Sequence, residues 1–289
     1  MFTPRDAGLL VRMTRPANVA IALATFTVAG YLSYRGSPAL WADPWFWAEA
    51  GLLVLIMASG YWVNDVYDFR IDRINRPERA WVGAAISTKK VLTVYFGVVF
   101  VCAVASALLP LKYLLLNLGA LLGLGLYARY LKRTPLWGNL VIASLTAFVV
   151  LAGALLHLLR LPLLWMIGFA FLATLVREVV KDAEDLRGDL RYGLKTLPAT
   201  VGLRATGRWV ALGYGLLLLA VWVPAATALA RGAPVPWGYL AVVGTTVQLP
   251  VVVGLVRLRH AARPTDYRWH SQLLKAILPG GLLALLLLA

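Results

Sequence analysis

Residues 51–72 read GLLVLIMASGYWVNDVYDFRID, an apolar run that ends in three carboxylates, Asp65, Asp68 and Asp72. The whole chain is 61% hydrophobic and only 14% charged, with a mean hydropathy of +0.75. Soluble domains are about half apolar, so this composition indicates a membrane protein. Because carboxylates are costly beside lipid, the sequence must provide something that offsets three of them at the end of one apolar run.

Apolar runs of this length recur along the chain. A helix of about 20 apolar residues is long enough to cross the hydrocarbon core of a bilayer. Nine runs qualify, at 16–34, 45–64, 90–109, 112–130, 137–158, 162–180, 208–230, 237–256 and 272–289. The sequence therefore predicts an all-α polytopic membrane protein with nine transmembrane helices. We expect residues 1–289 to form a single transmembrane domain whose first span is retained in the mature protein.

The basic residues are distributed unevenly between the segments that join these spans. If the N-terminus faces the cytoplasm, 24 of the 28 Lys and Arg residues fall on the cytoplasmic side, and only Arg35, Lys112, Arg160 and Arg231 lie opposite. This is the bias that the positive-inside rule describes. The net charge of +15 is thus explained by topology rather than by nucleic-acid binding. We expect a cell (inner) membrane protein with a cytoplasmic N-terminus and active site.

The first three carboxylates have a counterpart later in the chain. The segment DVYDFRID at 65–72 and the segment DAEDLRGD at 182–189 share one spacing, which repeats in Asp182, Asp185 and Asp189. At 100° per residue, positions i, i+3 and i+7 of a helix lie within about 60° of one another. Each trio is therefore predicted to form a carboxylate stripe on one helical face, at the cytoplasmic ends of the second and sixth spans.

Two such stripes require a compensating ligand. Neighbouring carboxylates on one stripe repel by roughly 3 kcal/mol at an effective dielectric constant near 20. A multivalent cation would offset the repulsion, and an all-oxygen set suits Mg²⁺. The single cysteine, Cys102, lies inside an apolar run, so a cysteine-rich metal site is excluded.

Basic residues near the stripes complete the predicted site. Arg177 and Lys181 lie one helical turn apart beside the second trio, and Lys132 ends the fourth span. Lys and Arg both bind phosphate. The pattern predicts a metal–diphosphate site at the mouth of an apolar cavity, which an apolar chain attached to a diphosphate would fit. Aromatic residues at suitable depth to face an allylic cation are Trp62, Tyr67 and Tyr127.

Four segments resemble the UbiA-type intramembrane prenyltransferases. NDVYDFRIDRINRP at 64–77 is similar to the first Asp-rich motif of that family, and REVVKDAEDLRGDLRYGLKTLP at 177–198 to the second. YARYLKRTPLWGN at 127–139 resembles the family's segment at the end of helix 4, and RPAN at 15–18 its entry to helix 1.

The resemblance implies nine helices around a central cavity, with cytoplasmic cap loops after helices 2 and 6. It also implies Mg²⁺-dependent transfer of a prenyl group from prenyl diphosphate to a lipid-soluble acceptor. The residues that it marks as catalytic Mg²⁺ ligands are Asp65, Asp68, Asp72, Asp182, Asp185 and Asp189. Those that it marks as diphosphate contacts are Asn18, Asn64, Tyr127, Lys132, Arg177 and Lys181.

The acceptor is indicated by the second motif. KDAEDLRGDLRYGLKTLP most resembles members that transfer a geranylgeranyl group to the hydroxyl of a glyceryl phosphate lipid. After the first motif, however, Ala80 and Trp81 stand where relatives have Pro and Ile. The alternatives are an aromatic prenyltransferase of quinone biosynthesis and, more distantly, a divalent cation transporter. The expected partners are prenyl diphosphate, the acceptor and membrane lipids, with no nucleic acid and no obligate protein partner.

Two further expectations concern the N-terminal arginines and one asparagine within a span. Arg5, Arg12 and Arg15 are expected to face lipid headgroups from a short interfacial helix. Asn117 is expected to hydrogen-bond to a neighbouring helix inside the membrane.

Overall fold

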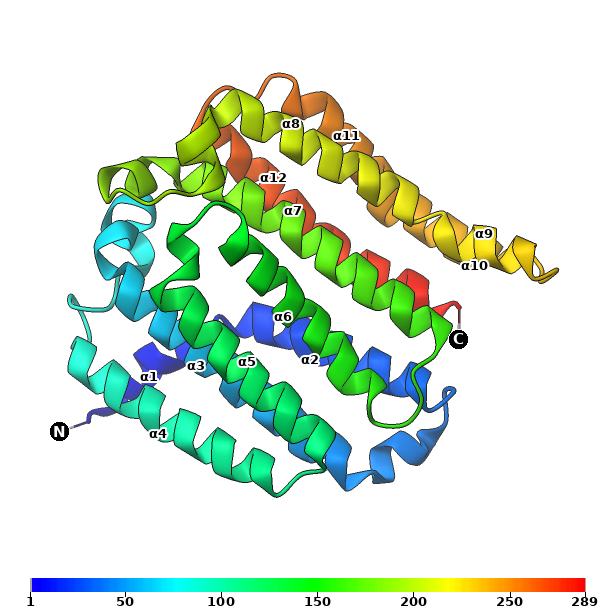
Figure 1. The fold of residues 1–289 in the computed structure, drawn as a ribbon, viewed down its shortest axis with the longest axis horizontal. Coiled ribbons are helices and arrows are strands. Elements are labelled where there is room, and N and C mark those ends of the chain that lie inside the picture. The colour runs from blue at the N-terminus through cyan, green and yellow to red at the C-terminus, as the bar shows by residue number, and fades with distance from the viewer. Residues whose placement is uncertain (1, 289) are drawn as a thin grey trace.

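The computed structural model describes residues 2–288, which fold almost entirely into helices (Figure 1). The α-helices are α1 (Pro4–Met13), α2 (Pro16–Ser33), α3 (Pro44–Asn75), α4 (Thr88–Ala107), α5 (Leu111–Arg129), α6 (Trp137–Ala154), α7 (Leu161–Arg191), α8 (Leu197–Ala220), α9 (Val223–Ala230), α10 (Trp237–Val243), α11 (Leu249–Leu258) and α12 (Pro264–Leu286). Short helical turns are η1 (Pro38–Ala42), η2 (Pro77–Arg79), η3 (Leu131–Arg133) and the π-helical η4 (Gly244–Gln248). Within residues 2–288 the β-structure is limited to one isolated bridge between Val82 and Ile86, so the all-α prediction is confirmed.

Eight helical segments of the described chain are long and apolar enough to cross a membrane. They are Pro16–Ser33, Pro44–Asn75, Thr88–Ala107, Leu111–Arg129, Trp137–Ala154, Leu161–Arg191, Leu197–Ala230 and Trp237–Leu258. The ninth expected span, 272–289, falls in α12 except for its last residues, and Ala289 lies outside the described chain. Asp266, Arg268 and Lys275 make the first half of α12 polar. A multi-pass helical protein is confirmed, while the count of nine stays a prediction.

Helices α3 and α7 are longer than the membrane requires. They contain 32 and 31 residues, against about 20 for one span. The additional turns carry the two carboxylate trios, so the trios are helical as the spacing predicts. Residues 76–87, which include η2 and the bridge between Val82 and Ile86, follow α3, and residues 192–196 follow α7. The expected cap formed by loops after these helices stays a prediction.

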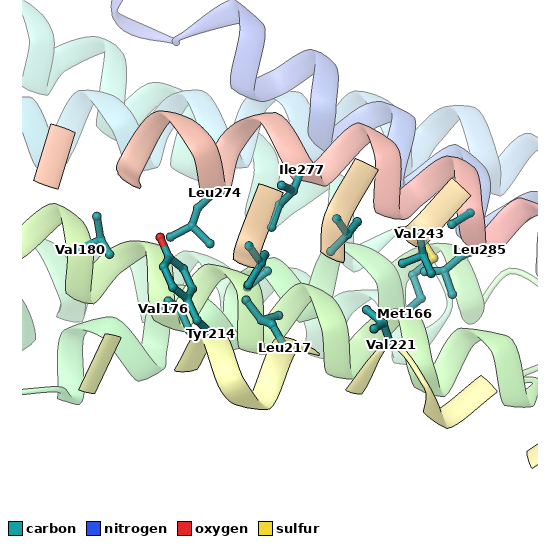
Figure 2. Close-up of a cluster of buried hydrophobic side chains, with 14 of the residues drawn as sticks. Met166, Val176, Val180, Tyr214, Leu217, Val221, Val243, Leu274, Ile277 and Leu285 are labelled. Atoms are coloured by element: carbon teal, nitrogen blue, oxygen red, sulfur yellow. The ribbon is translucent and has the colours of Figure 1, made fainter. Parts of the chain in front are cut away.

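The main hydrophobic core joins α7, α8, α10, α11 and α12, which lie side by side in Figure 1. Figure 2 shows Val176 of α7 beside Tyr214 of α8 and near Leu274 of α12. Further along the same core, Met166 of α7 lies near Val243 of α10 and Leu285 of α12. On the other side of the molecule α3 packs against α4 and α5. The two halves meet through α6, which packs against both α2 and α7.

Helix α1 packs against α3 and is bonded to both α3 and α4. The indole nitrogen of Trp62 donates a hydrogen bond to the carbonyl oxygen of Leu10 at 3.0 Å. Asp6 forms an ion pair with Lys90 of α4 at 2.8 Å. Trp62 therefore packs against α1 and does not line the central cavity, so its expected role beside an allylic cation is not supported.

Candidate functional site

One cavity of about 370 Å³ runs between the helices from the end that carries the carboxylate trios. Its lining changes from polar to apolar along its length. Polar and charged lining residues at this mouth are Arg15, Asn18, Tyr61, Asn64, Arg76, Arg79, Arg177, Glu178, Lys181 and Lys275. Apolar lining residues include Leu53, Met57, Leu124, Phe148, Phe169, Ala173 and Leu278. The cavity thus combines a charged entrance with a hydrocarbon-like interior.

The first trio, on α3, is held by amide and basic side chains. Asp65 and Asp68 are buried, with Asp68 only 4% exposed. Arg15 donates to Asp65 at 2.7 Å. Asn64 Nδ2 donates to Asp68 at 2.7 Å, and Lys132, from the turn between α5 and α6, forms an ion pair with the same carboxylate. Each buried carboxylate of this trio is thereby paired with a cation.

The second trio, on α7, has side-chain partners from three separate parts of the chain. Asn139 of α6 donates to Asp182 at 2.8 Å, and Thr196 donates to Asp189 at 3.0 Å. The guanidinium of Arg76 donates to both oxygens of Asp185, at 3.1 and 3.0 Å. Both bonds come from one guanidinium nitrogen, Nη2, and both are charge-assisted.

The ends of α3 and α7 are clasped directly to each other. Asn75 Nδ2 donates to the carbonyl oxygen of Asp185 at 2.8 Å, and Asn75 Oδ1 accepts from the amide of Gly188 at 2.9 Å. A Cβ atom at position 188 would lie 2.5 Å from Asn75 Nδ2, so only glycine leaves room for this clasp. The contact joins the ends of α3 and α7 that carry the two trios, which were expected on the same side from their positions at the ends of the second and sixth spans.

Five of the six predicted diphosphate contacts line this cavity, and the sixth is Lys132. Asn18 donates to the hydroxyl of Tyr61 at 3.2 Å, and Tyr127 lines the cavity wall. Arg177 and Lys181 both pair with Glu178, at 2.8 and 3.5 Å. Asn64 lines the same cavity, and Lys132 is linked to Asn64 through Asp68, the carboxylate that both side chains contact.

The charges of two basic groups outside the spans are stabilised by their partners. Burial alone lowers the pKa of Lys132, but the neighbouring Asp68 carboxylate outweighs it and raises the pKa above its ordinary value. Burial also lowers the pKa of Arg76, but the carboxylates of Asp185 and Glu184 outweigh burial and raise that pKa above its ordinary value. Both side chains are therefore cations at neutral pH.

The donor chemistry of the mouth fits a hard divalent cation such as Mg²⁺. Its candidate ligands are carboxylate and amide oxygens, and Asn64 Oδ1 is buried with no hydrogen-bond partner in the described chain. Across residues 2–288, no three acidic, His or Cys side chains stand close enough to hold a metal by themselves. Mg²⁺ commonly uses one or two carboxylates and completes its shell with water and substrate phosphate, so the set fits a shared site rather than a closed protein cage.

Several site residues were not anticipated from the sequence. Arg15 was expected to face lipid headgroups, but it contacts Asp65 instead, and its guanidinium lies 4.5 Å from the centre of the Tyr61 ring. Glu178 and Arg76 also lie at the mouth, although neither is among the site residues predicted from the sequence. Arg15 has a left-handed backbone, with φ of 54°, at the turn between α1 and α2, and that turn directs it inward. No local sequence signal identifies such a turn.

Fold and site together define a helical membrane protein whose charged, closely hydrogen-bonded mouth opens on one apolar cavity. Comparison with known proteins agrees with this class. The chain belongs to the UbiA prenyltransferase family, whose model matches residues 22–273.

Several curated relatives are similar to this chain. A digeranylgeranylglyceryl phosphate synthase from Thermococcus gammatolerans is 36% identical over 275 residues, covering 91% of each chain. One from Saccharolobus solfataricus is 35% identical over 189 residues, which cover 62% of this chain and 66% of the relative. The chain thus spans slightly less than two thirds of the length of some of the relatives it matches.

Two solved structures share the fold. A structure described under "Structural and mechanistic insights into the biosynthesis of Digeranylgeranylglyceryl phosphate synthase in membranes" has a TM-score of 0.74 at 22% identity, covering 97% of each chain. A UbiA homologue from Archaeoglobus fulgidus bound to GPP and Mg²⁺ has a TM-score of 0.66 at 14% identity, covering 96% of this chain and 99% of that one.

Proposed function

We propose that this protein transfers a geranylgeranyl group from its diphosphate to the glycerol hydroxyl of a prenylglyceryl phosphate, with Mg²⁺ as cofactor. The observation that carries the proposal is a cavity in which a mouth of basic and amide side chains opens directly on an apolar interior. A prenyl diphosphate has the same two parts in the same order. The relatives named digeranylgeranylglyceryl phosphate synthase support the acceptor, and the homologue bound to GPP and Mg²⁺ supports the donor and the metal.

The six trio carboxylates, Asp65, Asp68, Asp72, Asp182, Asp185 and Asp189, are the proposed Mg²⁺ ligands. When bound there, Mg²⁺ would neutralise charge on the leaving diphosphate and so ease cleavage of its bond to an allylic carbon. The carboxylates of both trios now contact Arg and Lys side chains. These cations are proposed to turn to the diphosphate as the substrate binds, which exchanges one set of ion pairs for another.

The remaining residues of the mouth are proposed to orient the donor and to exclude water. Arg177, Lys181 and Lys132 supply positive charge to the diphosphate, while Asn18 and Asn64 supply amide donors. Tyr127 and Tyr61 line the cavity just inside this ring and offer aromatic faces to a developing allylic cation. The apolar walls beyond them keep water from that cation.

A phosphorylated acceptor requires more positive charge than the donor alone. Arg79 of η2 and Lys275 of α12 line the same mouth, and neither forms an ion pair within residues 2–288. The positive charges of Arg177 and Arg79 also repel that of Lys275. An anion bound among these side chains would offset the repulsion. We propose that Arg79 and Lys275 bind the phosphate of the acceptor.

Changing these two residues should weaken acceptor binding selectively. In Arg79→Gln/Lys275→Gln we expect the KM for geranylgeranylglyceryl phosphate to rise by about 10- to 100-fold, the loss of one to two charge-assisted contacts. The KM for geranylgeranyl diphosphate should change little. Steady-state kinetics with each substrate varied in turn measure both values. Equal weakening of donor and acceptor would contradict a separate acceptor site, and Arg204→Gln is the matched control.

The mouth is proposed to face the cytoplasm of a cell (inner) membrane, together with the N-terminus. The support is the strong bias of Lys and Arg toward this end of the helices.

The function is tested with purified protein in lipid nanodiscs. Radiolabelled geranylgeranyl diphosphate and Mg²⁺ are supplied with either geranylgeranylglyceryl phosphate or a hydroxybenzoate acceptor. We expect lipid product only with the glyceryl phosphate, and loss of that product when EDTA removes the metal. Product only with the aromatic acceptor would favour the quinone-pathway alternative. Product with neither acceptor would contradict both forms of the proposal.

A further inference from the structure

A second polar group lies inside the cavity, far from the mouth. Glu49 of α3 is 2% exposed and Asn117 of α5 is 3% exposed. Asn117 Nδ2 donates to Glu49 Oε2 at 3.0 Å, which confirms the expected bond between Asn117 and a neighbouring helix. Both residues also line the cavity. The pair is therefore in contact with whatever fills the apolar interior.

Helix packing alone does not explain this pair. An ionisable side chain within a membrane span is costly, and two apolar residues would pack α3 against α5 without that cost. The role of Glu49 and Asn117 is better sought in the cavity that both of them line.

The distance between this pair and the polar mouth follows from one face of α3. Glu49, Leu53, Met57, Gly60 and Asn64 follow one another at helical spacing, and all of them line the cavity. Glu49 and Asn64 are 15 residues apart in a helix that rises 1.5 Å per residue, or about 22 Å. The stretch between them is apolar. It is comparable in length to an extended geranylgeranyl chain.

Helix α5, which packs directly against α3, repeats this arrangement on the adjoining part of the cavity wall. Asn117, Ala120, Leu124 and Tyr127 line the cavity, again with a polar residue at each end and apolar residues between. The two helices therefore form one wall of the channel, with an apolar surface that starts below the mouth and ends at the Glu49–Asn117 pair.

We propose that the Glu49–Asn117 hydrogen bond is the floor of the prenyl channel and sets the longest prenyl chain that the donor site accepts. This inference rests on the proposed function. A chain of geranylgeranyl length would stop above the pair. A longer chain would press its terminal methyl groups against the pair and separate it, which leaves two buried polar groups unpaired.

The test compares geranylgeranyl diphosphate with the homologue that is longer by one isoprene unit. Wild type is expected to prefer the geranylgeranyl donor. In Glu49→Ala/Asn117→Ala, which removes both polar partners together and enlarges the floor, the ratio of kcat/KM for the longer to the shorter donor should rise by about tenfold or more. An unchanged ratio in the folded double variant would overturn the inference.

Two control variants separate the floor from general changes in packing. Glu49→Gln keeps the size and the hydrogen bond and should keep the wild-type ratio. Leu115→Ala changes α5 on its outer face, where Leu115 is 63% exposed, and should also leave the ratio unchanged. A shift in Leu115→Ala equal to that of the double variant would contradict a specific floor.

A binding measurement distinguishes failure of this inference from failure of the proposed function. Unreactive thiodiphosphate analogues of both donors are titrated into wild type and the double variant. Tighter relative binding of the longer analogue to the double variant supports the floor even if no acceptor is prenylated. Identical relative binding in both proteins contradicts the floor even if transfer activity is normal.

Discussion

Asp68→Asn should lower kcat by about 100- to 1,000-fold or more while leaving the protein folded in the membrane. The substitution keeps the shape of a side chain that accepts hydrogen bonds from Asn64 and Lys132, but removes its charge. Under the proposed function, one Mg²⁺ ligand is lost where negative charge develops on the leaving diphosphate, and a single such electrostatic contribution is typically of this size. Turnover with geranylgeranyl diphosphate, followed over a range of Mg²⁺ concentrations, measures the effect.

The matched control for this variant is Glu78→Gln. Glu78 is an exposed carboxylate in η2, on the same side of the molecule but outside both trios. We expect it to retain turnover within about twofold, as surface substitutions usually do. Wild-type turnover in Asp68→Asn would remove Asp68 from the proposed metal site.

Lys132→Met should lower kcat/KM for the prenyl diphosphate by about 30- to 1,000-fold. The methionine side chain has similar length but carries no charge, so the diphosphate loses a cation, and losses of this kind amount to about 2 to 4 kcal/mol. The substitution also leaves Asp68 without its ion-pair partner. Kinetics with the donor varied, together with thermal unfolding followed by intrinsic fluorescence, measure both consequences.

Two further variants separate the loss of a diphosphate contact from the loss of the ion pair with Asp68. Lys132→Arg keeps the charge and should recover part of the lost kcat/KM. In Lys132→Met/Asp68→Asn the loss of thermal stability should be smaller than the sum of the two single losses, because the second change removes the unpaired carboxylate. Full donor affinity in Lys132→Met would contradict a diphosphate contact at this position.

The sequence anticipates the features that depend on neighbouring residues. Hydropathy runs locate the spans because, in lipid, the backbone must satisfy its own hydrogen bonds within a helix. The spacing of Asp182, Asp185 and Asp189 predicts one face of a helix, and α7 is continuous through all three. The bond made by Asn117 follows from the same reasoning, since a polar residue within a span needs a partner.

The contacts that the sequence does not reveal join residues far apart in the chain. Arg15 and Asp65 are 50 residues apart, and Arg76 and Asp185 are 109 apart. Glu49 lies near the start of a predicted span, where nothing local marks it as a cavity residue. These positions depend on how α2, α3, α5 and α7 pack against one another.

The sequence by itself determined an all-helical membrane protein, two carboxylate stripes at the ends of two helices, and an excess of basic residues on their side. Helical period and hydropathy are properties of short segments, and lipid enforces both. Tertiary structure alone decided which cation meets each carboxylate, that Asn75 and Gly188 clasp the two stripes together, and that Glu49 lies in the channel. Those outcomes depend on the packing of helices distant in sequence, where a single rotation of one helix would exchange one set of partners for another.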